Sequence, residues 1–164
     1  MKKHVLSVLV ENNSGVLSRI AGLFTRRGYN IDSLSVGTTE NPKISRMTIS
    51  VLEDESTLEQ IRKQLNKLVP VIKVVRLEGD RSIYRELVMI KVGAGVEDRS
   101  SIIDIANIFR GNVVDVSSES VVVEMTGDSN KISGLLEMLK PFGIIEIVRT
   151  GLTGIQRGYG SIGE

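Results

Sequence analysis

Residues 4–24 read HVLSVLVENNSGVLSRIAGLF, and this stretch decides how the fold begins. Every second residue from Leu6 to Val10 is apolar on one face, as expected of a half-buried strand. From Val16 onward, apolar residues recur at helical spacing. The polar residues 12–15 therefore form a short loop that joins a strand directly to a helix.

This loop has two possible roles. Asn13 or Ser14 can act simply as the N-cap of the helix. Alternatively, the free backbone N–H groups and the positive end of the helix dipole bind a small anion, which Gly15 allows to approach closely. The amide of Asn12 and a glycine in the first helical turn, where glycine weakens a helix, favour a ligand site.

A second polar segment, Asn30-Ile31-Asp32, begins the next expected strand. Together with the loop, it would suit a small zwitterion that carries an aliphatic tail. The sequence thus points to a binding site made of two separate segments.

Composition excludes several classes of site. The chain has 164 residues, of which 41% are hydrophobic, with no cysteine and one histidine. Disulfides, thiolate catalysis, zinc sites with sulfur ligands and multi-histidine metal sites are therefore excluded. No apolar run approaches the roughly 20 residues that span a bilayer, and Met1-Lys2-Lys3 leads into an alternating strand. We expect a cytoplasmic protein with no membrane partner.

Nucleic acid is not an expected partner. The 21 basic and 20 acidic residues are interspersed, and only 4% of residues are aromatic. Single-strand binding usually needs aromatic stacking platforms beside a basic groove.

The first half of the chain predicts a βαββαβ unit, which forms a four-stranded antiparallel sheet covered by two helices. Gly28 is expected to end the first helix, and Ser56 with Glu59 to form a capping box for the second. Pro70 is expected to terminate that helix. The expected elements are strands near 3–10, 30–38, 44–51 and 71–77 and helices near 15–27 and 56–69.

The same pattern repeats from Tyr84. Asp128 or Ser129 is expected to cap the last helix, and Pro141 to end it. The expected elements are strands near 87–92, 113–116, 120–126 and 144–148 and helices near 101–109 and 129–140. The fold class is therefore α+β, with two ferredoxin-like domains in tandem at 1–78 and 84–164, joined by a linker at 79–83. The glycine-rich end from Gly151 is assigned to the second domain as a mobile or partner-ordered tail.

Other motifs are weak. Gly93-Ala94-Gly95 follows a strand as a dinucleotide-binding loop would, but Asp98 stands where the third glycine should be, which favours an ordinary turn. His4 is interpreted as a surface residue, and Arg26-Arg27 as compensation of the helix dipole. No catalytic or metal-binding residue is predicted.

Several segments resemble the small regulatory subunit of acetohydroxyacid (acetolactate) synthase, along nearly the whole chain. The similarity is carried by Leu6–Val8, Glu11–Arg19, Leu23–Leu34, Ser45–Ile49, Gln64–Leu68, Glu86–Leu87, Ile90–Val92, Ile108–Gly111 and Gly151–Gly154.

This resemblance implies that the N-terminal domain is an ACT amino-acid-binding domain that pairs as a homodimer. It also implies a non-catalytic partner for a large subunit that carries thiamine diphosphate, magnesium and FAD, so this chain itself should hold no cofactor. The large subunit would condense pyruvate with pyruvate or 2-ketobutyrate in branched-chain amino-acid synthesis. The small subunit would activate it and confer feedback inhibition, typically by valine. The alternative is an ACT-type amino-acid sensor that serves a different enzyme.

By the same resemblance, the effector lies between the first loop of one chain and the second strand of its partner. The matching positions are Asn12, Gly15, Val16, Leu17, Asn30 and Ile31.

Overall fold

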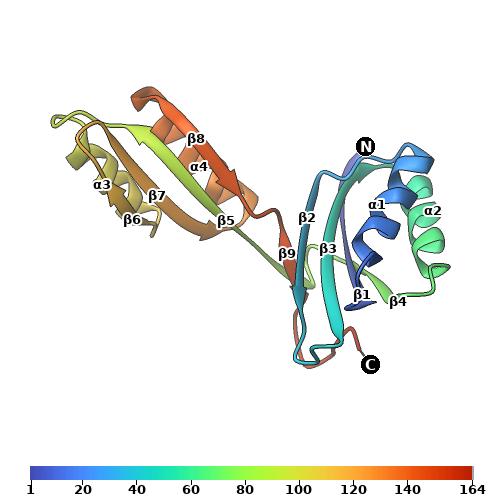
Figure 1. The fold of residues 1–164 in the computed structure, drawn as a ribbon. Coiled ribbons are helices and arrows are strands. Elements are labelled where there is room, and N and C mark those ends of the chain that lie inside the picture. The colour runs from blue at the N-terminus through green and yellow to red at the C-terminus, as the bar shows by residue number, and fades with distance from the viewer. Residues whose placement is uncertain (164) are drawn as a thin grey trace. The chain divides into compact units, whose positions relative to one another are not determined.

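A computed structural model describes residues 1–163, which divide into two compact units (Figure 1). The first unit comprises residues 1–83 and the C-terminal segment from Leu152 onward, and the second comprises Tyr84–Gly151. Each unit contains an antiparallel sheet and two α-helices in the order βαββαβ. The α+β fold class predicted from the sequence is confirmed.

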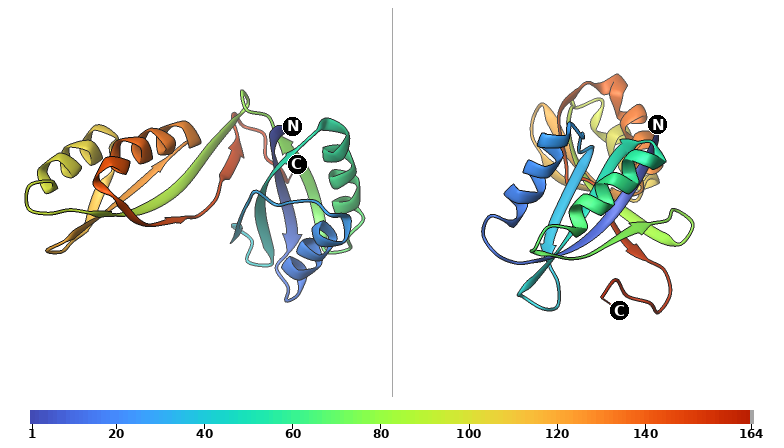
Figure 2. Two further views of the ribbon diagram at one scale, coloured as in Figure 1. Left: turned by 90° about the horizontal axis from the view of Figure 1, so that it is seen from above. Right: turned by 90° about the vertical axis from the view of Figure 1, so that its right-hand side faces the viewer.

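The first unit begins with the strand and helix that the opening stretch predicts. Its sheet has the strand order β2-β3-β1-β4, with antiparallel pairing throughout. Both helices cover the same face of this sheet (Figure 2). The elements are β1 (Lys2–Glu11), α1 (Val16–Arg27), β2 (Ser33–Thr38), β3 (Ile44–Glu53), α2 (Glu55–Asn66) and β4 (Val71–Leu77).

Alternation along the strands builds the core beneath the helices. Leu6, Val8 and Val10 of β1 are almost fully buried, as their spacing predicts. They pack with apolar residues of the helices and of β3, among them Ile20, Phe24, Met47, Ile49, Leu58 and Ile61. The opposite face of the sheet carries no helix and is covered in part by the C-terminal segment.

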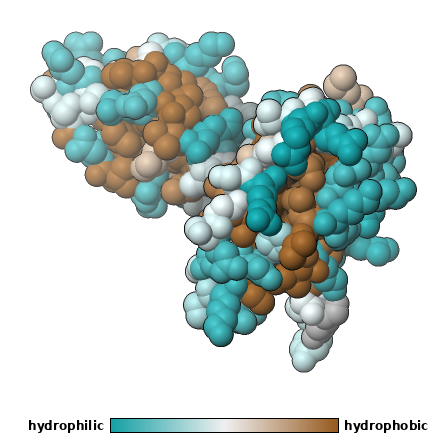
Figure 3. Space-filling model, turned by 45° about the vertical axis from the view of Figure 1, so that its right-hand side comes forward, coloured by the Kyte–Doolittle hydropathy of each residue, from teal (hydrophilic) through white to brown (hydrophobic). Residues whose placement is uncertain are grey.

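The second unit repeats the arrangement with the strand order β6-β7-β5-β8. Its elements are β5 (Ser82–Gly93), α3 (Arg99–Ile108), β6 (Asn112–Val116), β7 (Ser120–Gly127), α4 (Ser129–Leu139), the 3₁₀ turn η1 (Lys140–Phe142) and β8 (Ile144–Arg149). A broad hydrophobic area lies on the surface of this unit (Figure 3). Among its exposed apolar residues are Met89, Val114, Val116, Ile145, Ile147 and Val148. Within residues 1–163, no helix is long and apolar enough to cross a membrane.

Two helix ends lie at the residues that the sequence indicates, Gly28 after α1 and Asp128 before α4, whereas α3 begins at Arg99, two residues before the predicted start. Gly28 adopts the left-handed conformation and its N–H donates to the carbonyls of Phe24 and Thr25, as a C-terminal glycine should. Asp128 caps α4 by accepting from the Lys131 N–H. The predicted capping box at Ser56 is wrong, because Asp54 caps α2 by accepting from the Thr57 N–H at 2.8 Å. Asp54 lies just beyond the last β3 residue, so the N-cap lies two residues before the predicted Ser56 and the helix begins at Glu55.

The prediction that His4 lies on the surface is also wrong. Its side chain is only 3% exposed, and its Nε2 lies 3.2 Å from the carbonyl oxygen of Glu53. His4 shares the helix-covered face with Leu6 and Val8, so the alternation that buries the core buries this residue as well.

The C-terminal segment belongs to the first unit, whereas the sequence assigned it to the second domain. Its strand β9 (Thr153–Gln156) follows Leu152, whose N–H and carbonyl bond to the hydroxyls of Ser33 and Ser35 at 3.3 and 3.1 Å. Arg157 donates its N–H to the carbonyl of Arg81 at 2.8 Å. The segment predicted to be mobile or partner-ordered is therefore held on the first unit by its own backbone.

Removing the α2 cap should destabilise the first unit. In Asp54→Ala the Thr57 N–H loses its acceptor. Hydrogen bonding from the Thr57 backbone to the carboxylate lowers the pKa of Asp54 below its ordinary value. The stabilisation is therefore complete above the ordinary pKa and disappears as the pH falls through the lowered pKa. The urea midpoint of Asp54→Ala should lie below wild type at neutral pH and converge with it in acid. A larger loss in the control Ser56→Ala would show that the cap is misassigned.

Truncating the anchor of the C-terminal segment should have a larger effect. Leu152 is 5% exposed and Ile155 is 56% exposed. Leu152→Ala should lower the free energy of unfolding by about 2–5 kcal/mol. The matched variant Ile155→Ala should change it by about 0.5 kcal/mol or less. Urea unfolding followed by circular dichroism measures both, and equal effects would contradict the docked position of this segment.

Candidate functional site

The N-terminus of α1 is exposed and carries no side-chain cap among the described contacts. Gly15 occupies the N-cap position in the left-handed region, with φ 84° and ψ −8°, which glycine adopts without strain. The Val16 N–H makes one long bond, 3.4 Å, to the carbonyl of Asn13. Within residues 1–163, no acceptor outside the helix is seen for the N–H groups of Leu17 and Ser18.

Asn13 does not cap the helix, since its amide donates to a carboxylate oxygen of Glu11 at 3.0 Å. Uncapped N–H groups at the positive end of a helix dipole form a ready-made site for a carboxylate. The geometry therefore favours an anion site over a simple N-cap.

Asn12 is fixed by a contact that the sequence does not reveal. Its side-chain amide donates to the carbonyl of Pro42 at 2.9 Å, and its backbone N–H donates to the carbonyl of Lys43 at 2.8 Å. Asn12 thus ties the loop to the hairpin between β2 and β3, about 30 residues away along the chain. The acceptors are main-chain carbonyls, which no sequence motif marks. The side-chain oxygen of Asn12 remains available as an acceptor.

The residues after Gly15 differ in what they expose. The Val16 side chain is only 6% exposed and belongs to the core, so it can offer a ligand only its backbone. Leu17 is 46% exposed at the same helix end. Within one chain, Asn12, Gly15, Val16 and Leu17 are therefore brought together at the N-terminus of α1.

Asn30 and Ile31 lie between the C-terminal end of α1 and the start of β2. Asn30 is exposed, and Ile31 is half-buried against the core. The helix between the two groups has 12 residues, which corresponds to about 18 Å at 1.5 Å per residue. A single copy of the chain therefore does not bring the two halves of the predicted site together.

Asp32, the third residue of the second polar segment, is occupied by structural contacts. Its carboxylate pairs with Lys3 at 2.8 Å and accepts from the Ser50 hydroxyl at 3.3 Å. These contacts hold the beginning of β2 against β1 and β3.

The dinucleotide-like loop in the second unit is an ordinary turn. The Gly93 N–H donates to the carbonyl of Gly143 at 2.8 Å, and the Ala94 N–H donates to that of Glu119 at 2.9 Å. These N–H groups are therefore not free to bind a phosphate. Within residues 1–163, no three His, Cys, Asp or Glu side chains gather as a metal site would require.

Comparison with known proteins identifies both units. The family described as "AHAS small subunit-like ACT domain" matches residues 6–73, and the family "Small subunit of acetolactate synthase" matches residues 85–158. The acetolactate synthase small subunit of Mycobacterium leprae is 54% identical over 160 residues, covering 98% of this chain and 95% of its own. That of Mycolicibacterium smegmatis is 53% identical over 160 residues, covering 98% and 94%.

A solved structure extends the match to the fold. The crystal structure of the acetolactate synthase small subunit from Thermotoga maritima has a TM-score of 0.90 and 40% identity, covering 98% of this chain and all of that one. The sequence similarity and the structural similarity both extend over nearly the whole chain. This chain therefore belongs to the family of acetolactate synthase small subunits, and its N-terminal domain is an ACT domain.

Proposed function

We propose that this chain activates the large catalytic subunit of acetolactate synthase and makes it sensitive to feedback inhibition by valine. Membership of the small-subunit family implies a large catalytic partner. The observation that carries the regulatory part of the proposal is the uncapped N-terminus of α1 in an ACT domain. The thiamine diphosphate, magnesium and FAD belong on the large subunit in this proposal, and this chain supplies regulation only.

The effector carboxylate binds the N–H groups of Leu17 and Ser18, where Gly15 leaves room. An alanine Cβ built at Gly15 would meet no atom within 4 Å, so the approach to the helix end is open. The effector's ammonium group donates to the side-chain oxygen of Asn12, whose amide is already held by Pro42.

The second half of the site comes from a second copy of the chain. β2 lies at the edge of its sheet, so one side of its backbone is unpaired within the sheet. Two copies related by a twofold axis can pair their β2 strands antiparallel. The start of one β2 then lies beside the end of the other.

This pairing brings the separated residues together. β2 starts near the C-terminal end of α1, and it ends at the hairpin that Asn12 contacts near the N-terminal end. Antiparallel pairing therefore carries Asn30 and Ile31 of the second copy toward the Gly15 loop of the first. Asn30 adds an amide for the zwitterion, and Ile31 and Leu34 add apolar surface for the effector's side chain.

Regulation follows from the two-chain site. An effector that contacts both copies stabilises one dimer arrangement over others. Inhibition results when that arrangement activates the large subunit less well, and a coupling free energy of about 1–3 kcal/mol suffices for strong control. The reaction of the large subunit feeds branched-chain amino-acid synthesis. Valine is an end product of that synthesis, so it acts as the feedback signal.

Gly15→Asp should abolish this control. The new carboxylate would occupy the place of the effector's carboxylate and repel it. We expect no valine binding by calorimetry at concentrations that saturate wild type, and a reconstituted enzyme that valine no longer inhibits.

Two controls separate charge from other effects. Gly15→Ala imposes the same unfavourable φ without a charge, and should weaken valine binding far less than Gly15→Asp. Gly79→Asp adds the same charge in the turn after β4, where an added Cβ meets nothing within 4 Å, and should bind valine normally. Normal binding by Gly15→Asp would show that the helix end is not the effector site.

A further inference from the structure

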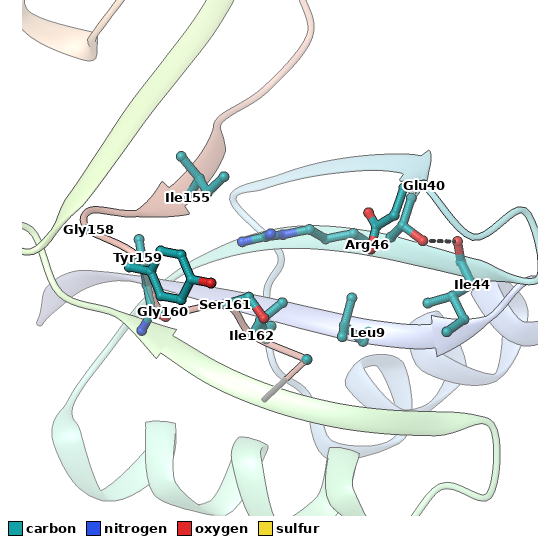
Figure 4. Close-up of a pocket in the computed structure, with 13 residues that line it drawn as sticks. Leu9, Glu40, Ile44, Arg46, Ile155, Gly158, Tyr159, Gly160, Ser161 and Ile162 are labelled. Atoms are coloured by element: carbon teal, nitrogen blue, oxygen red, sulfur yellow. Dashed lines mark hydrogen bonds between the residues drawn. The ribbon is translucent and has the colours of Figure 1, made fainter.

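A cavity of about 430 Å³ lies on the helix-free face of the first sheet (Figure 4). Its floor comes from β1 and β3, its rim from the hairpin after β2, and its cover from the C-terminal segment. The floor residues Leu9, Ile44 and Arg46 alternate with core residues, so they point away from α1 and α2. The cavity is therefore separate from the N-terminus of α1, and its volume lies within the range of about 300–1,000 Å³ typical of small-molecule sites.

Arg46 supplies a fixed positive charge to this cavity. Its Nε donates to the Ser7 hydroxyl at 2.8 Å, and its Nη2 donates to the carbonyl of Gly154 at 3.2 Å. Both acceptors are neutral, and no carboxylate within residues 1–163 approaches within ion-pair distance. Partial burial lowers the pKa of Arg46, and the negative charge of Glu40 raises it in part. A partly desolvated guanidinium with N–H groups left over is well suited to a carboxylate.

Glu40 supplies the negative charge. It lines the cavity from the hairpin, on the side away from the Arg46 guanidinium in Figure 4. Both residues line the cavity, and among residues 1–163 no ion pair joins them, so each can contact a ligand that carries both charges. Four aliphatic side chains, those of Leu9, Ile44, Ile155 and Ile162, form an apolar part of the wall beside polar and glycine residues of the C-terminal segment.

The cover of the cavity leaves room for a ligand. Gly158 takes a positive φ of 84°, which turns the chain back across the sheet. The Tyr159 side chain is 99% exposed and so does not fill the space, whereas Ile162 is 8% exposed and closes one side. The positive φ thus gives a structural reason for the glycine at position 158, which the sequence alone did not reveal.

We propose that this cavity is a second amino-acid site, which binds a small aliphatic α-amino acid as a zwitterion. Arg46 binds the carboxylate, Glu40 binds the ammonium group, and the aliphatic wall contacts the side chain. The site uses no residue of the α1 N-terminus and needs no second copy of the chain, so it stands independently of the proposed effector site.

The test is an NMR titration of the ¹⁵N-labelled full chain with valine. The amide resonances of Gly158–Ile162 and the Nε resonance of Arg46 should shift with the same half-saturating valine concentration. The Gly15–Ser18 amides report on the other site, so their half-saturating concentration is independent of it. Arg46→Gln should weaken the response of the Gly158–Ile162 amides by about tenfold or more. Glu40→Gln, which breaks no described hydrogen bond or ion pair to residues 152–163, should weaken it by about two- to fivefold. Arg27→Gln, an exposed arginine of the last turn of α1, is the matched control and should leave it unchanged.

Two further arms separate this site from the effector site and define its ligand. In Gly15→Asp the Gly158–Ile162 shifts should persist, whatever becomes of the shifts near α1. Isovalerate lacks the ammonium group and isobutylamine lacks the carboxylate, so each should bind more weakly than valine. Absence of shifts at millimolar valine, or shifts unchanged in both Arg46→Gln and Glu40→Gln, would overturn the site. Equal binding of isovalerate and valine would show that the ammonium group is not recognised and would contradict binding of a zwitterion.

Discussion

The helix α1 is the constraint on which the proposed regulation depends. It is a rigid rod of 12 residues, with Gly15 at one end and Asn30 just beyond the other. No side-chain movement can bring groups about 18 Å apart around one amino acid. A site that uses both must therefore be completed by a second copy, and the edge position of β2 offers the surface for it. In this arrangement, binding of the effector and pairing of the two chains are coupled. A small ligand can therefore stabilise one arrangement of a large assembly.

The two faces of the first sheet are covered in different ways. Helices α1 and α2 pack on one face through apolar side chains. On the other face, Ser35 and Arg46 donate hydrogen bonds to carbonyls of the C-terminal segment, and the Ser33 hydroxyl accepts one from the Leu152 N–H. The buried side chains of Leu152 and Ile162 add apolar contacts to these hydrogen bonds, and the cavity beside Arg46 lies under this cover. The hairpin between β2 and β3 borders this cavity and also holds Asn12, so it lies between the two proposed sites.

Local pattern predicted much of this structure, and distant contacts account for the rest. Three features depend only on near neighbours in the chain and were predicted from the sequence: the alternation in β1, the helical spacing in α1 and the glycine at position 28. The contact of the C-terminal segment with the first sheet was not predicted, because its partners Ser33 and Ser35 lie more than 100 residues away along the chain. The capping box at Ser56 competed with Asp54, and β3 ends so close to the helix that Asp54 reaches the first free N–H groups. The sequence indicated the site residues as a loop and a second segment. It did not indicate their separation along α1 or the hydrogen bond from Asn12 to the carbonyl of Pro42.

The central claim is that each effector site is shared between two chains, and mixed dimers test it most directly. Gly15→Asp damages the loop half of the site, and Asn30→Ala damages the β2 half, so neither homodimer should bind valine well. After subunit exchange, each mixed dimer holds one site with both halves intact and one with both damaged. Calorimetry of an equal mixture should recover about one quarter of the wild-type number of sites, as random exchange of a twofold dimer requires. No recovery on mixing, or normal binding by either homodimer, would contradict a shared site.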